Sequence, residues 1–294
     1  MKLGYIGLGV MGGPLARRLM QAYRLRVFDL DPARVAEFAA AGAVPAASPG
    51  ELAAECDLVF TCLPTSNEVR SVLFGAGGVA DTLPKGGIVA DMTTGDPAAT
   101  RAMAAEMAAR GLTLIDAPVS GGPHGAAAGT IALMLGAPDD VFARVKPVFE
   151  AISPNVFHCG DVGAGHTMKL VNNMIAASVR TVTFEAVTMG VKSGLALDRI
   201  VEVVNKGTGR SYTSEVMLPR LLDGSIKANF QVGLMVKDVS LATQCGADAG
   251  APMPVCGLVR ETLRAAMVEH GYQADINMLI RSMERAAKVK VVPD

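Results

Sequence analysis

A lysine and an asparagine four residues apart are the first side chains in this 294-residue sequence whose types and spacing suggest catalysis. Lys169 and Asn173 lie in the segment Gly163-Ala-Gly-His-Thr-Met-Lys-Leu-Val-Asn-Asn173, and residues four apart share one face of a helix. Most of their neighbours are apolar. Burial disfavours the charged form of an amine, so a lysine in such surroundings can titrate at ~7–8 instead of ~10.4. A lysine within a helix is more often a solvated surface residue, so the residues alone leave two roles open for Lys169, a surface position and proton exchange with a substrate hydroxyl.

A serine followed by two glycines offers a second kind of chemistry, the binding of a carboxylate. The segment is Ser120-Gly121-Gly122, just after an apolar run at residues 112–116. The serine supplies a hydroxyl donor, and the glycines leave their backbone N–H groups unobstructed. Together with Lys169, this nest predicts a substrate that carries both a hydroxyl and a free carboxylate.

A glycine-rich segment near the N-terminus predicts a dinucleotide site. It reads Gly7-Leu8-Gly9-Val10-Met11-Gly12 and lies between an expected strand and an expected helix. In such a loop the first glycine makes the tight turn and the second lets the backbone approach a pyrophosphate. The third glycine allows close packing of helix on strand, and the helix N-terminus then faces the phosphates. Because Gly-rich turns are common, the pattern is weak alone and depends on the elements around it.

An acidic residue after the second expected strand indicates which dinucleotide fits. Asp29 stands 17 positions after Gly12. A carboxylate there accepts hydrogen bonds from the adenosine ribose hydroxyls and repels a 2′-phosphate. No arginine follows it directly, because the next three residues are Leu-Asp-Pro. We therefore predict NAD, and not NADP, as the cofactor.

The elements that must position these residues alternate through residues 1–162, as in βαβ units. The fold class is therefore predicted to be α/β, with a doubly wound parallel Rossmann-type sheet as the NAD-binding domain. Expected strands are residues 2–6, 25–29, 57–62, 87–91, 112–116, 131–135 and 155–158, and expected helices are residues 11–21, 32–41, 67–74, 97–110 and 139–151.

Residues 163–294 are predicted to form an all-helical second domain. It starts with a long interdomain helix at residues 166–193, which carries Lys169 and is apolar nearly all round. A helix with that composition is expected to be buried on most sides. Further helices are expected to Lys290, with breaks near residues 207–209, 223–224 and 250–254. We expect this domain to carry the catalytic lysine and to support oligomerisation.

Composition excludes several classes of protein. Half of the residues are hydrophobic and the formal net charge is −1, so no basic surface predicts nucleic acid or membrane as a partner. The longest uncharged stretch, residues 117–138, is broken by glycines and prolines and is not expected to span a membrane. Five cysteines without a C-x-x-C pair predict free thiols, no metal site and a cytoplasmic protein.

With these residues in place, the chain resembles the β-hydroxyacid dehydrogenase family, which includes 3-hydroxyisobutyrate dehydrogenase and tartronate semialdehyde reductase. The resemblance covers essentially the whole chain. Four motifs carry it in order: the glycine-rich loop, the Ser120 segment, the Lys169 segment and Lys237-Asp238-Val-Ser-Leu-Ala242.

The resemblance implies a role for each motif. Lys169 would be the catalytic acid and base, while Asn173 and Ser120-Gly121-Gly122 would hold the substrate. Leu63, Pro64, Thr94 and Lys237 would contact the cofactor. From the residues alone, the segments at Leu63 and Thr94 fit ordinary loop chemistry equally well, and Lys237 beside Asp238 fits a surface ion pair. Members of the family are typically dimers or tetramers.

These observations predict an NAD-dependent dehydrogenase that oxidises a small 3-hydroxy acid, similar to 3-hydroxyisobutyrate, to its semialdehyde or keto acid. The alternative is tartronate semialdehyde reductase or another carbonyl or imine reductase on the same scaffold. Lys169 argues against imine reduction, since that class commonly has Asp or a neutral residue there. His124 and His166 flank the proposed site, but a single histidine is more often structural. Tyr212 and Pro123-His124 depart from relatives near the C2 substituent of the acid, so the exact substrate stays open.

Overall fold

The computed structural model describes residues 1–293. The chain divides into two compact units, Met1–Lys169 and Leu170–Asp294, the second described as far as residue 293. The division falls inside helix α9 (Ala164–Lys192), seven residues after the boundary predicted from the sequence at 162/163. Lys169 is therefore the last residue of the first unit, although the sequence placed it with the helical domain.

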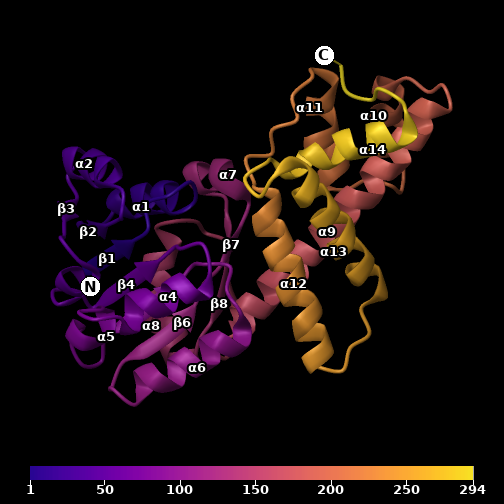
Figure 1. The fold of residues 1–294 in the computed structure, drawn as a ribbon. Coiled ribbons are helices and arrows are strands. Elements are labelled where there is room, and N and C mark those ends of the chain that lie inside the picture. Colours follow the sequence, from indigo (N-terminus) through magenta and orange to yellow (C-terminus); the bar gives the residue numbers. More distant parts are fainter. Residues whose placement is uncertain (294) are drawn as a thin grey trace. The chain divides into compact units, whose positions relative to one another are not determined.

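The first unit is built on a nine-stranded sheet with the order β3-β2-β1-β4-β5-β6-β8-β7, with β9 paired to β8 (Figure 1). The first six strands in this order are parallel, and β1 lies where the strand order reverses. This confirms the doubly wound Rossmann-type class. The strands are β1 Leu3–Ile6, β2 Leu25–Phe28, β3 Val44–Pro45, β4 Leu58–Thr61, β5 Ile88–Asp91, β6 Thr113–Asp116, β7 Val119–Ser120, β8 Ala132–Gly136 and β9 Val156–Gly160.

The sheet is not parallel throughout, which the sequence did not predict. Strand β8 runs antiparallel to both β6 and β7. The chain leaves β7 through one short helix and returns along it, and such short returns produce antiparallel neighbours. The long crossover that parallel strands require is absent from this connection.

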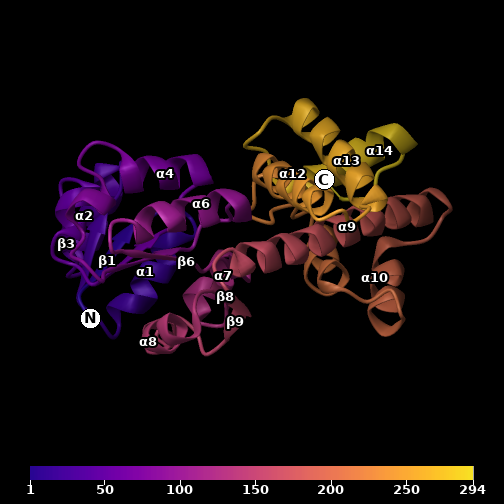
Figure 2. The ribbon, with the colours of Figure 1, turned by 90° about the horizontal axis from the view of Figure 1, so that it is seen from below.

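Helices cover both faces of the sheet (Figure 2). Leu15, Phe38 and Phe149 belong to one apolar core, while Leu52, Val69 and Met107 belong to a second. The strands supply alternate residues to the two cores, as their period of two requires. The helices of this unit are α1 Gly12–Met20, α2 Pro32–Ala40, α3 Pro49–Ala53, α4 Ser66–Phe74, α5 Val79–Thr82, α6 Pro97–Ala108, α7 Gly122–Ala128 and α8 Asp139–Glu150.

The sequence did not predict five short elements, which are β3, β7, α3, α5 and α7. Each is seven residues long or shorter. Segments of this length contain too few residues to show apolar side chains at a period of 2 or 3.6 residues. They therefore cannot be distinguished from loops by sequence pattern.

The second unit is helical, as expected, and its core includes Leu170, Phe184, Leu218 and Leu263. Helix α9 has 29 residues and begins two residues before the predicted start. The other elements are α10 Leu197–Lys206, the π-helix η1 Thr213–Met217, α11 Leu218–Leu222, α12 Val232–Asp248, α13 Pro254–His270, the 3-10 helix η2 Ile276–Met278 and α14 Leu279–Ala287.

The prediction that α9 is buried on most sides is wrong for this chain. A row of apolar side chains stays exposed along it: Met168, Val171, Ile175, Val182 and Met189. These residues recur at helical spacing, so they form one stripe. The helix is also long and apolar enough, by length and composition, to cross a membrane. The core helix of a soluble protein passes the same test, and 44% of its most apolar stretch is buried within the structure.

Candidate active site

The glycine-rich loop between β1 and α1 has the geometry of a dinucleotide cradle. Gly7 has φ +96°, a conformation that side chains rarely adopt. A Cβ atom at Gly12 would lie 1.9 Å from the Gly7 carbonyl oxygen, so the helix could not pack this closely with any other residue. Gly9 and Val10 are accessible at the tip of the loop. The loop therefore fits the pyrophosphate of NAD or NADP at the N-terminus of α1.

Asp29 lies beside this loop, as predicted. Its Oδ2 accepts a hydrogen bond from Leu8 N at 2.6 Å, and its Oδ1 accepts one from Asp31 N at 2.8 Å. The carboxylate thus holds the loop in shape, and each oxygen keeps a lone pair for a ribose hydroxyl. The first of these two hydrogen bonds joins the loop after β1 to the residue that follows β2, 21 positions away.

The structure also brings Arg34, which the sequence argument missed, to the same place. A Cβ atom at Gly9 would lie 3.2 Å from Nη1 of Arg34. The guanidinium also pairs with Asp31, with Nε 3.2 Å from Oδ2. Arg34 does not follow Asp29 directly in the sequence, but the first turn of α2 returns it toward the loop.

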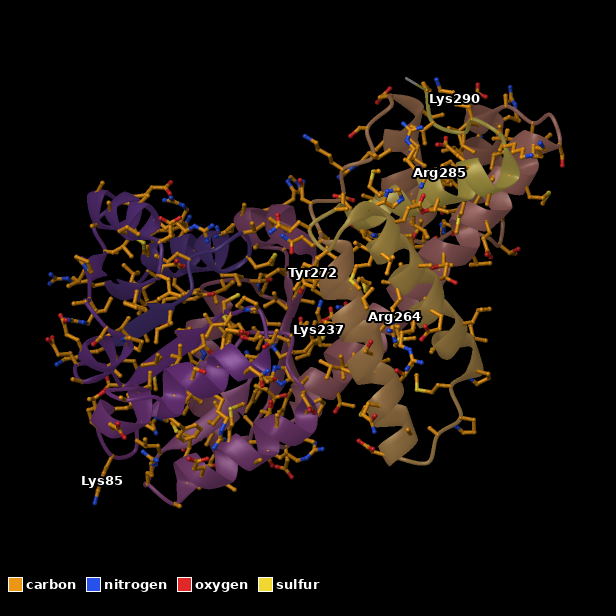
Figure 3. The ribbon with its side chains drawn as sticks, viewed as in Figure 1. Lys85, Lys237, Arg264, Tyr272, Arg285 and Lys290 are labelled. Atoms are coloured by element: carbon orange, nitrogen blue, oxygen red, sulfur yellow. The ribbon has the colours of Figure 1, made fainter. Side chains whose placement is uncertain are left out.

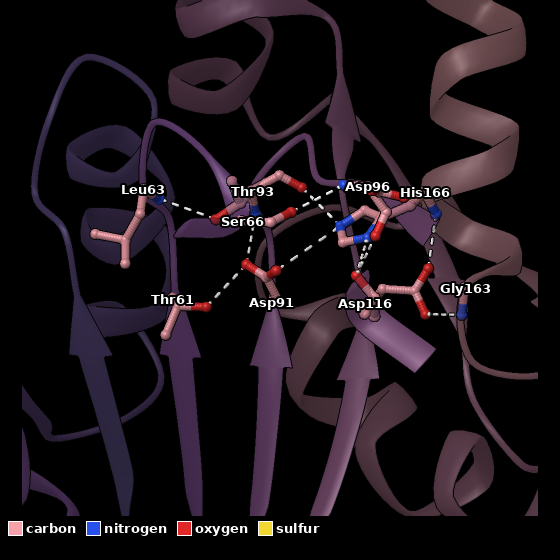
Figure 4. A network of polar contacts seen from close by, with 10 residues as sticks. Thr61, Leu63, Ser66, Asp91, Thr93, Asp96, Asp116, Gly163 and His166 are labelled. Carbon is pink, nitrogen blue, oxygen red and sulfur yellow. Dashed lines mark hydrogen bonds and ion pairs between the residues drawn. The ribbon is translucent and has the colours of Figure 1, made fainter. Parts of the chain in front are cut away.

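A hydrogen-bond network joins the carboxyl ends of β4 and β5 (Figure 4). Thr93 Oγ1 accepts from Leu63 N at 3.0 Å, and Asp91 Oδ1 accepts from Thr93 N at 3.0 Å. Asp91 Oδ1 also accepts from the Thr61 hydroxyl at 2.9 Å. The network positions the two segments that the resemblance assigned to the cofactor. In those segments Pro64 is exposed and Thr94 is partly exposed.

The proposed carboxylate nest lies where β7 passes into α7. Gly121 has φ +138° and Gly122 has φ +66°, so both positions favour glycine. Both glycines are exposed and Ser120 is partly exposed. The glycines at the start of α7 are therefore accessible, and the binding of an anion by their backbone N–H groups stays a prediction.

Asp116, at the end of β6, caps the helix that carries Lys169. Its Oδ1 accepts from Gly163 N and its Oδ2 accepts from His166 N, both at 2.6 Å (Figure 4). Burial raises the pKa of Asp116 above its ordinary value, while His166 and the backbone donors act in the opposite direction. The cap fixes the first turn of α9, and Lys169 follows three residues after His166 with 9% of its surface exposed.

His166 is a structural residue in this arrangement. It is 0% exposed, and its Nε2 lies 2.8 Å from the Thr93 carbonyl oxygen, which only accepts. Its Nδ1 lies 2.9 Å from the Thr100 hydroxyl. Both ring nitrogens are therefore in use. His124 is exposed on α7.

Replacing Asp116 by asparagine should lower the free energy of unfolding by about 1–3 kcal/mol, because an amide cannot accept from both N–H groups without presenting a donor to one of them. Urea unfolding of the full chain measures this change. Asp161→Asn is the matched control, because Asp161 precedes the same helix and is exposed. Equal stability of the Asp116 variant and wild type would refute the role of the cap.

The second unit contains another polar group on α9. Asn173 is 5% exposed, and its Nδ2 donates to Asp238 Oδ2 at 2.6 Å. Lys237 Nζ lies 3.1 Å from the other oxygen of the same carboxylate (Figure 3 labels Lys237). Asp238 is 1% exposed and the Lys237 side chain is 18% exposed, so the ion pair is not a surface pair: its carboxylate is buried and its ammonium is partly buried. Because a carboxylate only accepts, Asp238 also determines which way the Asn173 amide points.

Each unit therefore holds a separate group of predicted residues. The first unit joins the dinucleotide loop, Asp29 and the segments at Leu63 and Thr94, and it also contains Ser120 and Lys169. The second unit joins Asn173 to Lys237. Among residues 1–293 no group of three or more His, Cys, Asp or Glu side chains could hold a metal ion.

Two family models match the two parts of the chain. Residues 2–160 match the family model described as the NAD binding domain of 6-phosphogluconate dehydrogenase. Residues 163–283 match the model described as "NAD-binding of NADP-dependent 3-hydroxyisobutyrate dehydrogenase".

Individual relatives agree over nearly the full length. The chain is 35% identical to 2-(hydroxymethyl)glutarate dehydrogenase of Eubacterium barkeri, over 99% of this chain and 97% of that protein. It is 36% identical to 3-hydroxyisobutyrate dehydrogenase of Pseudomonas aeruginosa, over 88% of this chain and 89% of that protein. The solved structure of Mycobacterium tuberculosis 3-hydroxyisobutyrate dehydrogenase with L-serine aligns with a TM-score of 0.88 and 30% identity, covering 96% of this chain and 98% of that one.

Proposed function

Since the chain belongs to the β-hydroxyacid dehydrogenase family and is an oxidoreductase of hydroxy acids, we propose that it oxidises a small 3-hydroxy acid with NAD. The observation that carries this proposal is the position of Lys169. It is nearly buried, in the first turns of a helix capped by Asp116, and it belongs to the same unit as the dinucleotide loop.

Lys169 has the chemistry for proton transfer. In oxidation its neutral amine accepts the hydroxyl proton as the carbon–hydrogen bond breaks and the carbonyl bond forms. In reduction its ammonium returns the proton to the developing alkoxide. When bound, the nicotinamide supplies the acceptor for the hydride that leaves the hydroxyl-bearing carbon. Asn173, one turn later on α9, is held by Asp238 and is proposed to orient the substrate.

The substrate class follows from the nest at Ser120. Both 3-hydroxyisobutyrate and 2-(hydroxymethyl)glutarate, named for the relatives above, carry a hydroxymethyl group beside the carbon that bears a carboxylate. The test is an assay of the purified chain with NAD and 3-hydroxyisobutyrate against 2-methyl-1-propanol, which lacks the carboxylate. A primary alcohol that reacts as fast as the acid would refute the carboxylate nest.

Replacing Ser120 by alanine should raise KM for the hydroxy acid by about tenfold or more, because one charge-assisted hydrogen bond to the carboxylate is lost. Affinity for NADH should not change, since the dinucleotide loop is a separate segment. Steady-state kinetics and NADH titration measure the two quantities. Ser71→Ala on α4 is a matched control, and an unchanged KM in the Ser120 variant would count against the assignment.

We also propose that the protein is a homodimer or homotetramer and is cytoplasmic. The exposed apolar stripe of Met168, Val171, Ile175, Val182 and Met189 supports self-association, since side chains of this kind are usually covered. The near-neutral net charge and the five free thiols are consistent with the compartment.

A further inference from the structure

A buried arginine in the second unit has no partner that explains it. Arg180, on α9, is 8% exposed. Its Nε and Nη1 atoms are buried and have no hydrogen-bond partner in the part of the chain that the structure describes. None of the ion pairs found among residues 1–293 includes Arg180. A guanidinium presents five donors, so most of its hydrogen-bonding capacity is unused.

This arrangement costs stability unless something binds there. A charged group removed from water needs an opposite charge and hydrogen bonds to offset the loss of hydration. Burial lowers the pKa of Arg180, and Asp275 and Tyr212 act in the opposite direction. Asp275 does not serve as the missing partner. Its oxygens accept from the backbone of Ala228, Asn229 and Asn277 instead.

The position of Arg180 on α9 relates it to the proposed substrate. It follows Asn173 by seven residues, which is nearly two turns, so both side chains lie on one face, ~10 Å apart along the axis. Side chains on a helix tilt toward its N-terminus, and the long arginine side chain can reach further in that direction than the short asparagine side chain. Tyr212, which the sequence analysis placed near the C2 substituent, precedes the π-helix η1 and acts electrostatically on Arg180.

The stripe that would contact a second copy lies on the other side of the helix. At ~100° per residue, Val171, Ile175 and Val182 lie roughly 180–220° around α9 from Asn173 and Arg180. The polar face that carries Asn173 and Arg180 is therefore separate from the apolar face proposed for self-association. A substrate group fits Arg180 better than a carboxylate of a second copy does.

We propose that Arg180 binds a second carboxylate of the substrate, so that the preferred substrates are 3-hydroxy acids whose C2 substituent ends in a carboxylate. This inference rests on the proposed function, because it assumes that the hydroxyl lies near Lys169 and Asn173. Arginine is suited to the role, since its planar fork binds a carboxylate through two parallel hydrogen bonds. A short carbon chain at C2 separates the second carboxylate from the reacting hydroxyl.

The test compares kcat/KM for 2-(hydroxymethyl)glutarate with kcat/KM for 3-hydroxyisobutyrate in the full chain. Wild type should prefer the dicarboxylate by ~10-fold or more. Arg180→Met should reduce this ratio by roughly 30-fold, since a charge-assisted pair is lost. Arg199→Met is the matched control, because Arg199 lies in the same unit and its side chain is 68% exposed. The control variant should keep the wild-type ratio.

Thermal unfolding provides a readout that does not need turnover. Glutarate, which lacks the hydroxyl, should raise the Tm of wild type but not that of Arg180→Met. Without ligand, the variant should be as stable as wild type or more stable, because it removes a buried unpaired charge. A lower Tm together with a smaller oligomer by sedimentation would show that Arg180 pairs with a second copy, and would overturn the proposal.

Failure of this inference is distinct from failure of the proposed function. If wild type oxidises 3-hydroxyisobutyrate but does not prefer the dicarboxylate, and glutarate does not change its Tm, the role of Arg180 is refuted and the proposed function stands. If neither acid is oxidised, the proposed function fails, and a glutarate effect that depends on Arg180 would still establish a dicarboxylate site.

Discussion

Replacing Lys169 by alanine is expected to lower kcat by ~10²–10⁴ while NADH affinity stays within about threefold, because general acid–base catalysis contributes that much. In the first unit, Lys169 lies on α9 three residues after His166, whose backbone N–H donates to Asp116. Removing it leaves the hydroxyl proton without an acceptor at that position. Steady-state kinetics and fluorescence titration with NADH measure the two quantities.

Two further variants sharpen this test. Lys169→Arg should be nearly as damaging as alanine, because a guanidinium does not deprotonate at the pH of the assay. Lys192→Ala, at the exposed end of the same helix, should leave kcat unchanged. A Lys169→Ala enzyme that keeps more than a tenth of the wild-type kcat would mean that another group carries the proton. Of the two nearby histidines, the exposed His124 would then be the first to test, since His166 uses both ring nitrogens.

The pH dependence of oxidation follows from the same step. The amine must be neutral to accept the hydroxyl proton, so the rate of oxidation should rise with pH, and the rate of reduction should fall. In the Lys169→Ala variant, the rates of oxidation and reduction should no longer change with pH in opposite directions.

The second large effect concerns the choice of cofactor. Wild type is expected to use NAD at least ~100-fold better than NADP in kcat/KM, or about 2.7 kcal/mol, because Asp29 repels a 2′-phosphate. Asp29→Ser should lower the ratio of kcat/KM with NAD to kcat/KM with NADP. Since Asp29 also holds Leu8 and Asp31, absolute activity should fall with both cofactors, so the ratio is the quantity to compare.

Asp29→Asn removes the charge with almost no change in side-chain size. Its amide has one acceptor oxygen and so loses one of the two hydrogen bonds from Leu8 N and Asp31 N, and the ratio is again the quantity to compare. Arg34, which pairs with Asp31, lies beside Gly9 and offers a guanidinium to a 2′-phosphate once Asp29 is neutral, which should favour NADP further. Glu37→Gln on α2 is the control, and its ratio should equal that of wild type. Equal use of NAD and NADP by wild-type protein would refute the assignment of NAD.

The sequence by itself determined the features that depend on neighbouring residues. The turn at Gly7, the close packing at Gly12 and the positive φ values at Gly121 and Gly122 each arise from steric limits at a single position. The fold class and the long helix followed from periods of 2 and 3.6 residues, which are also local properties. The family that the short motifs predicted is confirmed by comparisons that cover nearly the whole chain.

Only the tertiary structure determined which side chains from distant parts of the sequence lie in contact and which are buried. Asp116 caps α9 from 47 and 50 residues away, and Asp238 reaches Asn173 across 65 residues. Arg34 lies beside Gly9, and Nε and Nη1 of Arg180 are buried without a hydrogen-bond partner among residues 1–293. The burial and hydrogen bonding of such groups depend on how separate elements pack, and no local pattern records that packing. The proton-transfer role of Lys169 could therefore be proposed from the sequence, whereas its cap at Asp116 and the burial of Arg180 could not.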